Sequence, residues 1–307
     1  MAASESSKKL RVLLVPFFAT SHIGPFADFA VALAAAKPGA VDPTIAVTPA
    51  NVAVLRYAID RHGSAASISV KIATYPFPRV DGLAPGVENL SAAGEDGWRI
   101  DAAAVEASLT RPAQEALLRE QSPDAIVTDV HFLWNIAVAA ELGVPCVMFN
   151  VIGIFSTLAM HNLGRAAIED GGQQEVTVPG LPGPEIRLPV SELPEFLRCN
   201  QDGVKQSQAA MGEYFGVAVN TFQDLERPYC DMSVRSGFLK RGYFVGPLSL
   251  LLPPAGQGAG VGESPCLRWL GIVHSKSFCR KMSTSYSALL RKLRHCAHAN
   301  VIHHVFS

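Results

Sequence analysis

Residues 11–36, RVLLVPFFATSHIGPFADFAVALAAA, decide the fold that this sequence predicts. Val12–Val15 form a short apolar run, which is typical of a parallel strand covered on both faces. Gly24 and Pro25 then mark the start of a helix that extends to Ala36, because proline in a first helical turn loses no needed hydrogen bond. The stretch therefore predicts the first half of a βαβ unit.

One histidine, His22, falls in the loop expected between this strand and this helix. In open α/β sheets, ligands bind outside the carboxyl ends of the strands, where such a loop lies. The position favours a functional role for His22. On position alone, an ordinary polar loop residue explains it equally well.

The composition is that of a globular α/β protein. The chain has 307 residues, of which 49% are hydrophobic and 17% are charged, enough to form one large or two modest α/β domains. Its six cysteines are scattered without a CxxC pair, which fits a reducing compartment. Residues 1–9 are polar and run directly into a strand, so we expect no secretory signal and a cytoplasmic location.

An uncharged stretch, residues 142–164, has the length of a membrane span. Gly143 and Pro145 interrupt its start, and polar residues such as Asn150 would lie at membrane depth. A buried strand followed by a buried helix describes the stretch better. We therefore expect no membrane partner.

The last part of the chain differs in charge from the rest. The formal net charge of the chain is −1, yet residues 264–307 hold seven Lys or Arg residues and no acidic residue. Basic residues dispersed without aromatic neighbours do not favour nucleic-acid binding. The histidines of this stretch and Cys296 match no standard zinc spacing, so the sequence predicts no metal site.

Strands and helices alternate along the body of the chain, which is typical of a doubly wound parallel sheet. Proline- and glycine-rich loops are expected over 75–97 and 171–194. The expected strands after the first are 44–48, 67–74, 124–129, 145–150, 216–220 and 243–245, and the expected helices are 51–58, 100–120, 132–142, 154–169, 202–212 and one starting at 224. The pattern over 100–120 has Pro112 inside it and also fits two helical pieces.

An aspartate, Asp129, ends the fourth expected strand. In the common strand order 3-2-1-4-5, the first and fourth strands are neighbours, so His22 and Asp129 would face one crevice. A carboxylate that accepts a hydrogen bond from one imidazole nitrogen fixes the tautomer and leaves the other nitrogen free to take a proton. The pair predicts a general base, and the alternative for Asp129 is a helix cap.

Six segments occur in one order between residues 12 and 270, and together they resemble plant family-1 glycosyltransferases. These enzymes use UDP-sugars and have the GT-B fold of two Rossmann-like domains. The six segments are VLLVPFFATSHIGPFADFA, AIVTDVHFLWNIAVAAELGVPCVMF, VPGLPGPEIRLPVSELP, VNTFQDLE, VGPL and CLRWL.

This resemblance implies a reaction and a pocket. It implies that His22 deprotonates the acceptor hydroxyl, that Asp129 orients His22, and that the activated oxygen displaces UDP with inversion at the sugar. It also implies an apolar pocket for a flavonoid, phenolic or terpenoid acceptor. An ordinary core is the other interpretation for most of the candidate acceptor-binding residues, which are Phe18, Ile23, Phe132, Trp134, Asn150 and Phe155, with Phe17, Phe149 and Met160 as further pocket candidates.

The resemblance ends at Leu270, and the sequence departs from the family pattern in two places. Asn150 stands where many relatives carry a small hydroxyl residue, and residues 271–307 contain no counterpart of the tryptophan-, histidine- and glycine-rich box that holds the UDP-sugar. We expect a disordered start, an acceptor-binding Rossmann-like domain, a remnant of an interdomain linker and an atypical basic tail, over 1–9, 10–249, 250–270 and 271–307 respectively.

The sequence therefore predicts a UDP-dependent glycosyltransferase with a UDP-sugar as co-substrate and no cofactor. Because residues 271–307 contain no counterpart of the donor-binding box, we expect the chain to be impaired or inactive alone. The alternative is a non-catalytic protein, derived from the same domain, that binds a small ligand or a protein partner.

Overall fold

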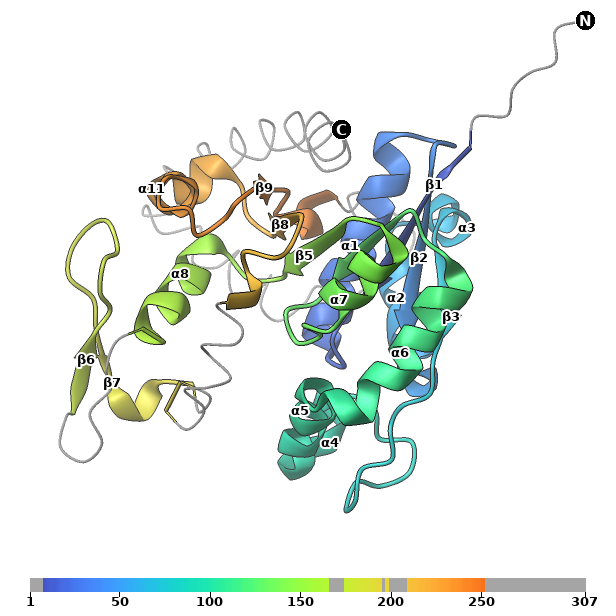
Figure 1. Cartoon of the computed structure of the whole chain (residues 1–307), viewed down its shortest axis with the longest axis horizontal. Coiled ribbons are helices and arrows are strands. Elements are labelled where there is room, and N and C mark those ends of the chain that lie inside the picture. Colours follow the sequence, from blue (N-terminus) through green and yellow to red (C-terminus); the bar gives the residue numbers. More distant parts are fainter. Residues whose placement is uncertain (1–7, 166–173, 195–196, 199–208, 252–307) are drawn as a thin grey trace, which may run out of the picture.

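A computed structural model describes residues 8–165, 174–194, 197–198 and 209–251 (Figure 1). The expected disordered start lies outside these ranges except for residues 8 and 9. The expected linker lies outside them except for residues 250 and 251, and the basic tail lies outside them entirely. Most of the helix expected over 202–212 is also outside. The domain boundaries at the two ends of the chain therefore stay predictions.

A seven-stranded sheet forms the centre of the fold, and all its neighbouring strands are parallel. The strand order is β3-β2-β1-β4-β5-β8-β9. This order confirms the doubly wound topology expected from the sequence and makes β1 and β4 neighbours. The strands are β1 (Leu10–Val15), β2 (Val41–Val47), β3 (Lys71–Thr74), β4 (Ala125–Thr128), β5 (Cys146–Asn150), β8 (Gly216–Val219) and β9 (Gly242–Phe244).

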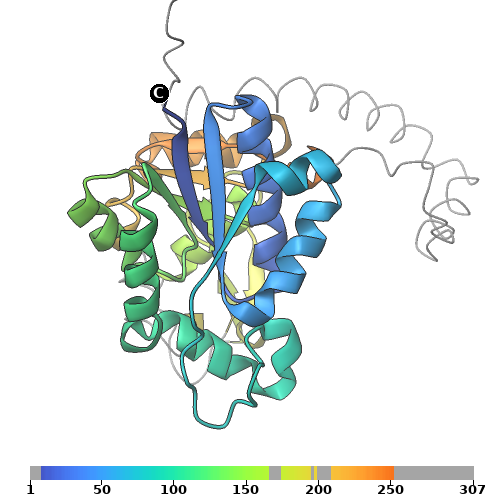
Figure 2. The same ribbon diagram turned by 90° about the vertical axis from the view of Figure 1, so that its right-hand side faces the viewer.

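Helices cover both faces of this sheet (Figure 2). Successive residues of a strand point to opposite faces, so in β1 Leu13 joins one core and Leu14 joins the other. The core that contains Leu14 packs against α1 (Thr20–Ala36), α2 (Val52–Asp60) and α3 (Ser64–Ser69). The core that contains Leu13 packs against α5 (Gly97–Val105), α6 (Ala107–Gln121), α7 (Asn135–Leu142) and α11 (Gln223–Arg235).

A third, smaller core lies around α8 (Ile154–Leu163) and a two-stranded antiparallel hairpin. The hairpin, formed by β6 (Glu175–Thr177) and β7 (Arg187–Pro189), lies within the stretch expected to be an irregular loop. The remaining short elements are α4 (Leu90–Ala93) and the 3₁₀ turns Pro49–Asn51, Gly94–Asp96, Val190–Glu192 and Leu248–Leu251. Of the helices in the described part of the chain, none combines the length and hydropathy that crossing a bilayer requires.

The strand expected over 67–74 is wrong in its first half. Residues 64–69 form α3, whose end is closed by a hydrogen bond from the Val70 amide to the Ala66 carbonyl, at 3.2 Å. A strand there would have needed to bury Ile68, which is exposed instead, while Ala66 is buried. The strand β3 begins only at Lys71.

The helix expected over 100–120 is two helices, and the break lies at Glu106. Glu106 has an extended backbone, and its carboxylate accepts hydrogen bonds from the amide and hydroxyl of Ser108. This cap precedes the first residue of α6, Ala107. Pro112 lies inside α6. An N-cap therefore separates the two helices, and the proline does not.

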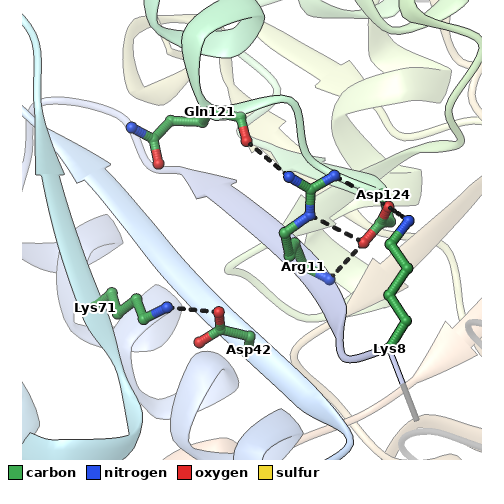
Figure 3. A network of polar contacts seen from close by, with 6 residues as sticks. All are labelled: Lys8, Arg11, Asp42, Lys71, Gln121 and Asp124. Atoms are coloured by element: carbon green, nitrogen blue, oxygen red, sulfur yellow. Dashed lines mark hydrogen bonds and ion pairs between the residues drawn. The ribbon is translucent and has the colours of Figure 1, made fainter. Parts of the chain in front are cut away.

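Charged residues gather where β1 and β4 begin (Figure 3). Asp124, just before β4, accepts hydrogen bonds from the Arg11 amide at 2.9 Å, the Arg11 guanidinium and the Lys8 ammonium at 3.0 Å. The hydrogen bonds from Arg11 hold the pKa of Asp124 well below its usual range. Lys71 and Asp42 form a separate ion pair that joins β3 to β2, at 2.6 Å. These contacts lie at the edge of the sheet where the parallel strands start.

Candidate functional site

The opposite edge of the sheet carries His22. The helix α1 begins at Thr20, because the Ala19 carbonyl already accepts the amides of His22 and Ile23, both at 2.9 Å. The loop placement expected for His22 is therefore wrong, and His22 lies in the first turn of α1. Burial of Ile23 holds this turn in place, although Pro25 inside the helix removes one backbone hydrogen bond.

Asp129 follows the last residue of β4 and is almost fully buried, with 1% of its surface exposed. Its amide donates to the carbonyl of Val15 at 3.0 Å, so the ladder between β1 and β4 fixes its position. Its Oδ2 lies 2.7 Å from His22 Nδ1 and accepts a further hydrogen bond from the Phe17 amide at 3.2 Å. The structure therefore brings together the two residues that the sequence singled out.

A second imidazole, His131, shares the same carboxylate. Its Nδ1 lies 2.7 Å from Asp129 Oδ1, and its backbone amide donates to the same oxygen at 3.3 Å. Each carboxylate oxygen thus holds one imidazole. Sequence reasoning did not single out His131, although its position two residues after Asp129 was a readable signal.

The charge on Asp129 reflects these contacts. Burial alone favours the neutral acid, but the hydrogen bonds from His131 and His22 outweigh it and hold the pKa of Asp129 well below its usual range. Asp129 is therefore an ionised carboxylate at neutral pH. An ionised acceptor selects the tautomer in which each imidazole carries its proton on Nδ1.

Phe17 packs against both imidazoles, and the three rings contact one another. Its ring is stacked on that of His131, with centroids 4.0 Å apart and an interplanar angle of 12°. Its edge meets His22 at a centroid distance of 5.1 Å. The two imidazole rings themselves are 5.3 Å apart and inclined by 72°. The rings hold each other in fixed orientations above one buried carboxylate.

Comparison with known proteins supports one family. No family model matches the sequence. Solanidine UDP-glucose glucosyltransferase 1 of Solanum tuberosum is 29% identical over 81% of this chain and 52% of its own length. UDP-glucosyl transferase 73DL1 of Saponaria officinalis is 33% identical over 68% of this chain and 44% of its own length.

Among solved structures, UGT73P12 of Glycyrrhiza uralensis, complexed with glycyrrhetinic acid 3-O-monoglucuronide, superposes with a TM-score of 0.64. It is 29% identical and covers 80% of this chain, which in turn covers 50% of it. The chain belongs to the plant family-1 UDP-glycosyltransferases. It spans about half the length of the curated relatives and structures that it matches.

Three of the expected acceptor-binding residues lie together, and all three are buried. Phe132 contacts both Phe18 and Trp134, with ring centroids 5.4 Å apart in each pair. Trp134 is held by a hydrogen bond from its indole Nε1 to Gln114, which also donates to Tyr75, both at 2.9 Å. The aromatic cluster begins directly beside Phe17.

The other three expected acceptor-binding residues lie elsewhere. Ile23 belongs to the core on the opposite face of the sheet, and Asn150 hydrogen-bonds to Thr157 and to the amide of Ile152, in the turn that leads into α8. Phe155, on α8, meets the edge of Tyr229 on α11. A role in acceptor binding stays a prediction for all six.

A further acid interacts with the two imidazoles. Asp101, on α5, interacts electrostatically with both His131 and His22. Partial burial raises the pKa of Asp101, and the two imidazoles oppose that rise. Only the fold brings α5 to this edge, so no spacing in the sequence indicated Asp101.

Proposed function

We propose that this chain is the acceptor-binding, base-bearing half of an enzyme that transfers a sugar from a UDP-sugar to a hydroxyl of a small apolar molecule, with inversion. The observation that carries the proposal is the 2.7 Å contact between His22 Nδ1 and the buried, ionised Asp129. It leaves His22 Nε2 with a free lone pair and with no partner among the described residues.

The proposed reaction uses this lone pair as a general base. The acceptor O–H gives its proton to His22 Nε2 while its oxygen bonds to the anomeric carbon. The bond between that carbon and the departing phosphate oxygen breaks on the opposite face, and UDP leaves with the electron pair. Asp129 stabilises the imidazolium that forms, and such a base contributes roughly 10²–10⁴-fold in rate.

We propose a flat, apolar acceptor of the flavonoid, phenolic or terpenoid class, with the aromatic cluster as the apolar packing beside the base. Phe17, Phe18, Phe132 and Trp134 form a continuous set of ring contacts that starts at His22. All four residues are buried, with at most 8% of each exposed, so in this structure they pack as core behind His22. Two similar proteins, a solanidine glucosyltransferase and UGT73P12 complexed with glycyrrhetinic acid 3-O-monoglucuronide, agree with the terpenoid part of this class.

We further propose that the chain alone binds the acceptor but needs a donor-binding domain for turnover. It spans about half the length of its relatives, and residues 271–307 carry none of the donor-binding box expected from the family. A measurable affinity of the chain for UDP-glucose by calorimetry would contradict this division. The scattered cysteines, with Cys146 and Cys230 buried as free thiols, support a cytoplasmic location.

A chimera tests the proposed function. Residues 1–249 are joined to the donor-binding half of the Solanum tuberosum relative and assayed with UDP-glucose and a panel of flavonols and triterpenoid alcohols. We expect turnover that His22→Ala lowers roughly 10²–10⁴-fold. Asp124→Asn, at the far edge of the sheet, is the matched control and should leave kcat within about twofold of the parent, since the substitution lies outside the site.

The same assay distinguishes the proposed enzyme from the alternative, a non-catalytic binding protein. Acceptor binding without turnover in the chimera would favour a non-catalytic ligand-binding protein. Turnover that survives His22→Ala unchanged would overturn the proposed role of His22.

A further inference from the structure

We propose that His22, Asp129 and His131 form a binding site for a divalent transition-metal ion such as Zn²⁺, and that the bound ion switches the base off. No sequence spacing predicts this site, because His22 and Asp129 are 107 positions apart and come from different elements. The further step, the loss of base function, rests on the proposed function, whereas metal binding does not.

The ligand geometry carries the proposal. One ligand atom from each of the three residues lies within 4.8 Å of the others. Zn²⁺ binds imidazole nitrogen at about 2.0–2.1 Å and carboxylate oxygen at about 2.0–2.2 Å, and three protein ligands with one open position are its usual set at reactive sites. Tetrahedral ligands at these bond lengths lie about 3.4 Å apart, so the two 2.7 Å N···O contacts need to widen by about 0.7 Å to admit the ion.

The charge of the site favours a cation. Asp129 offers a carboxylate whose two oxygens each face one imidazole, and carboxylate and imidazole are ligand types that suit a divalent transition-metal ion. Asp101, on α5, is a second carboxyl group that interacts with both imidazoles. The imidazoles of His22 and His131 are only partly exposed, with 18% and 26% of the side-chain surface accessible, so the ion would be shielded but reachable.

Coordination conserves protons at each neutral imidazole. In the free site, Nδ1 carries the proton and donates it to Asp129. When the ion binds Nδ1, the proton is found on Nε2, and the imidazole stays neutral with no net proton released. His22 then has no free lone pair, since one nitrogen binds the ion and the other binds the proton. Metal binding and proton abstraction by His22 exclude each other.

The test is Zn²⁺ titration of the full chain by calorimetry, comparing the unchanged protein with His131→Phe. Phenylalanine keeps an aromatic ring against Phe17 but cannot bind the ion. We expect the unchanged protein to have one Zn²⁺ site whose affinity falls by roughly 10–100-fold or more in His131→Phe. Removing even a hydrogen-bond partner of a metal ligand has an effect of this size. Equal Zn²⁺ binding by both proteins would overturn the proposal.

Two further measurements keep the test decisive. The tail holds competing chelators, His295, His298, His303, His304 and Cys296, so the titration is repeated with these five replaced, and the expected site must remain. In the unchanged chain, ¹⁵N-labelled imidazole signals of His22 and His131 should respond to the first equivalent of Zn²⁺. A response confined to the tail histidines would overturn the proposal even if His131→Phe fails to fold.

The result of the Zn²⁺ titration can be told apart from the result of the chimera assay that tests the proposed function. Zn²⁺ binding by the chain does not depend on turnover, and a chimera without activity leaves the binding result intact. In an active chimera, Zn²⁺ should inhibit the parent at lower concentration than it inhibits His131→Phe. Inhibition at equal concentrations would show that the ion acts elsewhere and would overturn the switch.

Discussion

One strand, β4, carries an aspartate at each end, and the two acids have opposite surroundings. Asp124 precedes the strand, keeps 21% of its side-chain surface exposed and is bound by Lys8 and Arg11. Asp129 follows the strand, has 1% exposed and is bound by His22 and His131. Both have a pKa below the usual range because of hydrogen bonds from basic partners.

The difference between these two ends separates a structural role from a chemical one. Lysine and arginine remain charged across the physiological range, so the contacts of Asp124 can only hold the strands together. Imidazole exchanges protons near neutral pH, so the contacts of Asp129 can move a proton. The same residue type at the two ends of one strand thus serves the fold at one end and the proposed reaction at the other.

The largest effect on stability is expected at Asp129. Asp129→Ala leaves two imidazoles and the amides of Phe17 and His131 without their acceptor in a buried place. We expect the free energy of unfolding to fall by about 3–5 kcal/mol, the usual cost of breaking a buried charge pair. Urea unfolding measures it, and a loss under about 1 kcal/mol would mean that the two ends of β4 are equivalent.

Acid should remove the contribution of Asp129 to the free energy of unfolding. Because folding lowers the pKa of this acid, its contribution is present above the unfolded value of about 3.9 and is lost as pH falls toward the folded value. The stability difference between the parent and Asp129→Asn should therefore shrink below about pH 3.9. A difference that stays constant down to pH 2.5 in chemical unfolding would contradict the depressed pKa.

A smaller effect is expected at Asp124. Its partners are solvated and its carboxyl is partly exposed, so screening by water limits the value of the contacts. We expect Asp124→Ala to lower the free energy of unfolding by about 1 kcal/mol, and by less in 1 M NaCl. A loss as large as that of Asp129→Ala, unaffected by salt, would erase the contrast between the two ends.

The smallest effect is expected at Asp101, and its sign is opposite. Partial burial raises the pKa of Asp101, so the folded chain binds its proton more tightly than the unfolded chain, and stability falls as pH rises through this window. Asp101→Asn removes the stability loss that accompanies ionisation of Asp101. It should therefore stabilise the chain by about 0.3 kcal/mol at pH 7, after allowance for solvent screening. Thermal unfolding at pH 7 and pH 4 measures it. A destabilised variant at pH 7 would show that the attraction to the imidazoles dominates.

The sequence predicted the central sheet well because its signal is local. Apolar runs such as Val12–Val15 identify strands buried on both faces, and the alternation with helices fixes the class of topology. From that topology the meeting of His22 and Asp129 followed directly. The errors occurred where weak local patterns compete: Ser64–Ser69 contains the alternation of a strand but forms a helix that leaves Ile68 exposed.

Residues that join the site through tertiary structure were harder to predict. Asp101 lies on α5, which ends at the break before Glu106, and its interaction with the two imidazoles depends on how the fold packs this helix. Phe17 was expected to line a pocket, but its stacking on His131 depends on a backbone turn after β1 that no pattern encodes. His131 is the exception, since the spacing Asp-x-His was visible and its meaning was not recognised.

The amide of Asp129 is tied to Val15, inside a ladder that pairs β4 with β1 on one side and β5 on the other. A shift by one residue in this register would turn the acid to the opposite face of the sheet. The orientation of His22 is thus fixed during folding. The conformational entropy of its side chain is already lost before an acceptor binds. In the proposed reaction, a molecule that enters the site therefore meets a rigid base, and selectivity among acceptors depends on how each presents its hydroxyl to a fixed point.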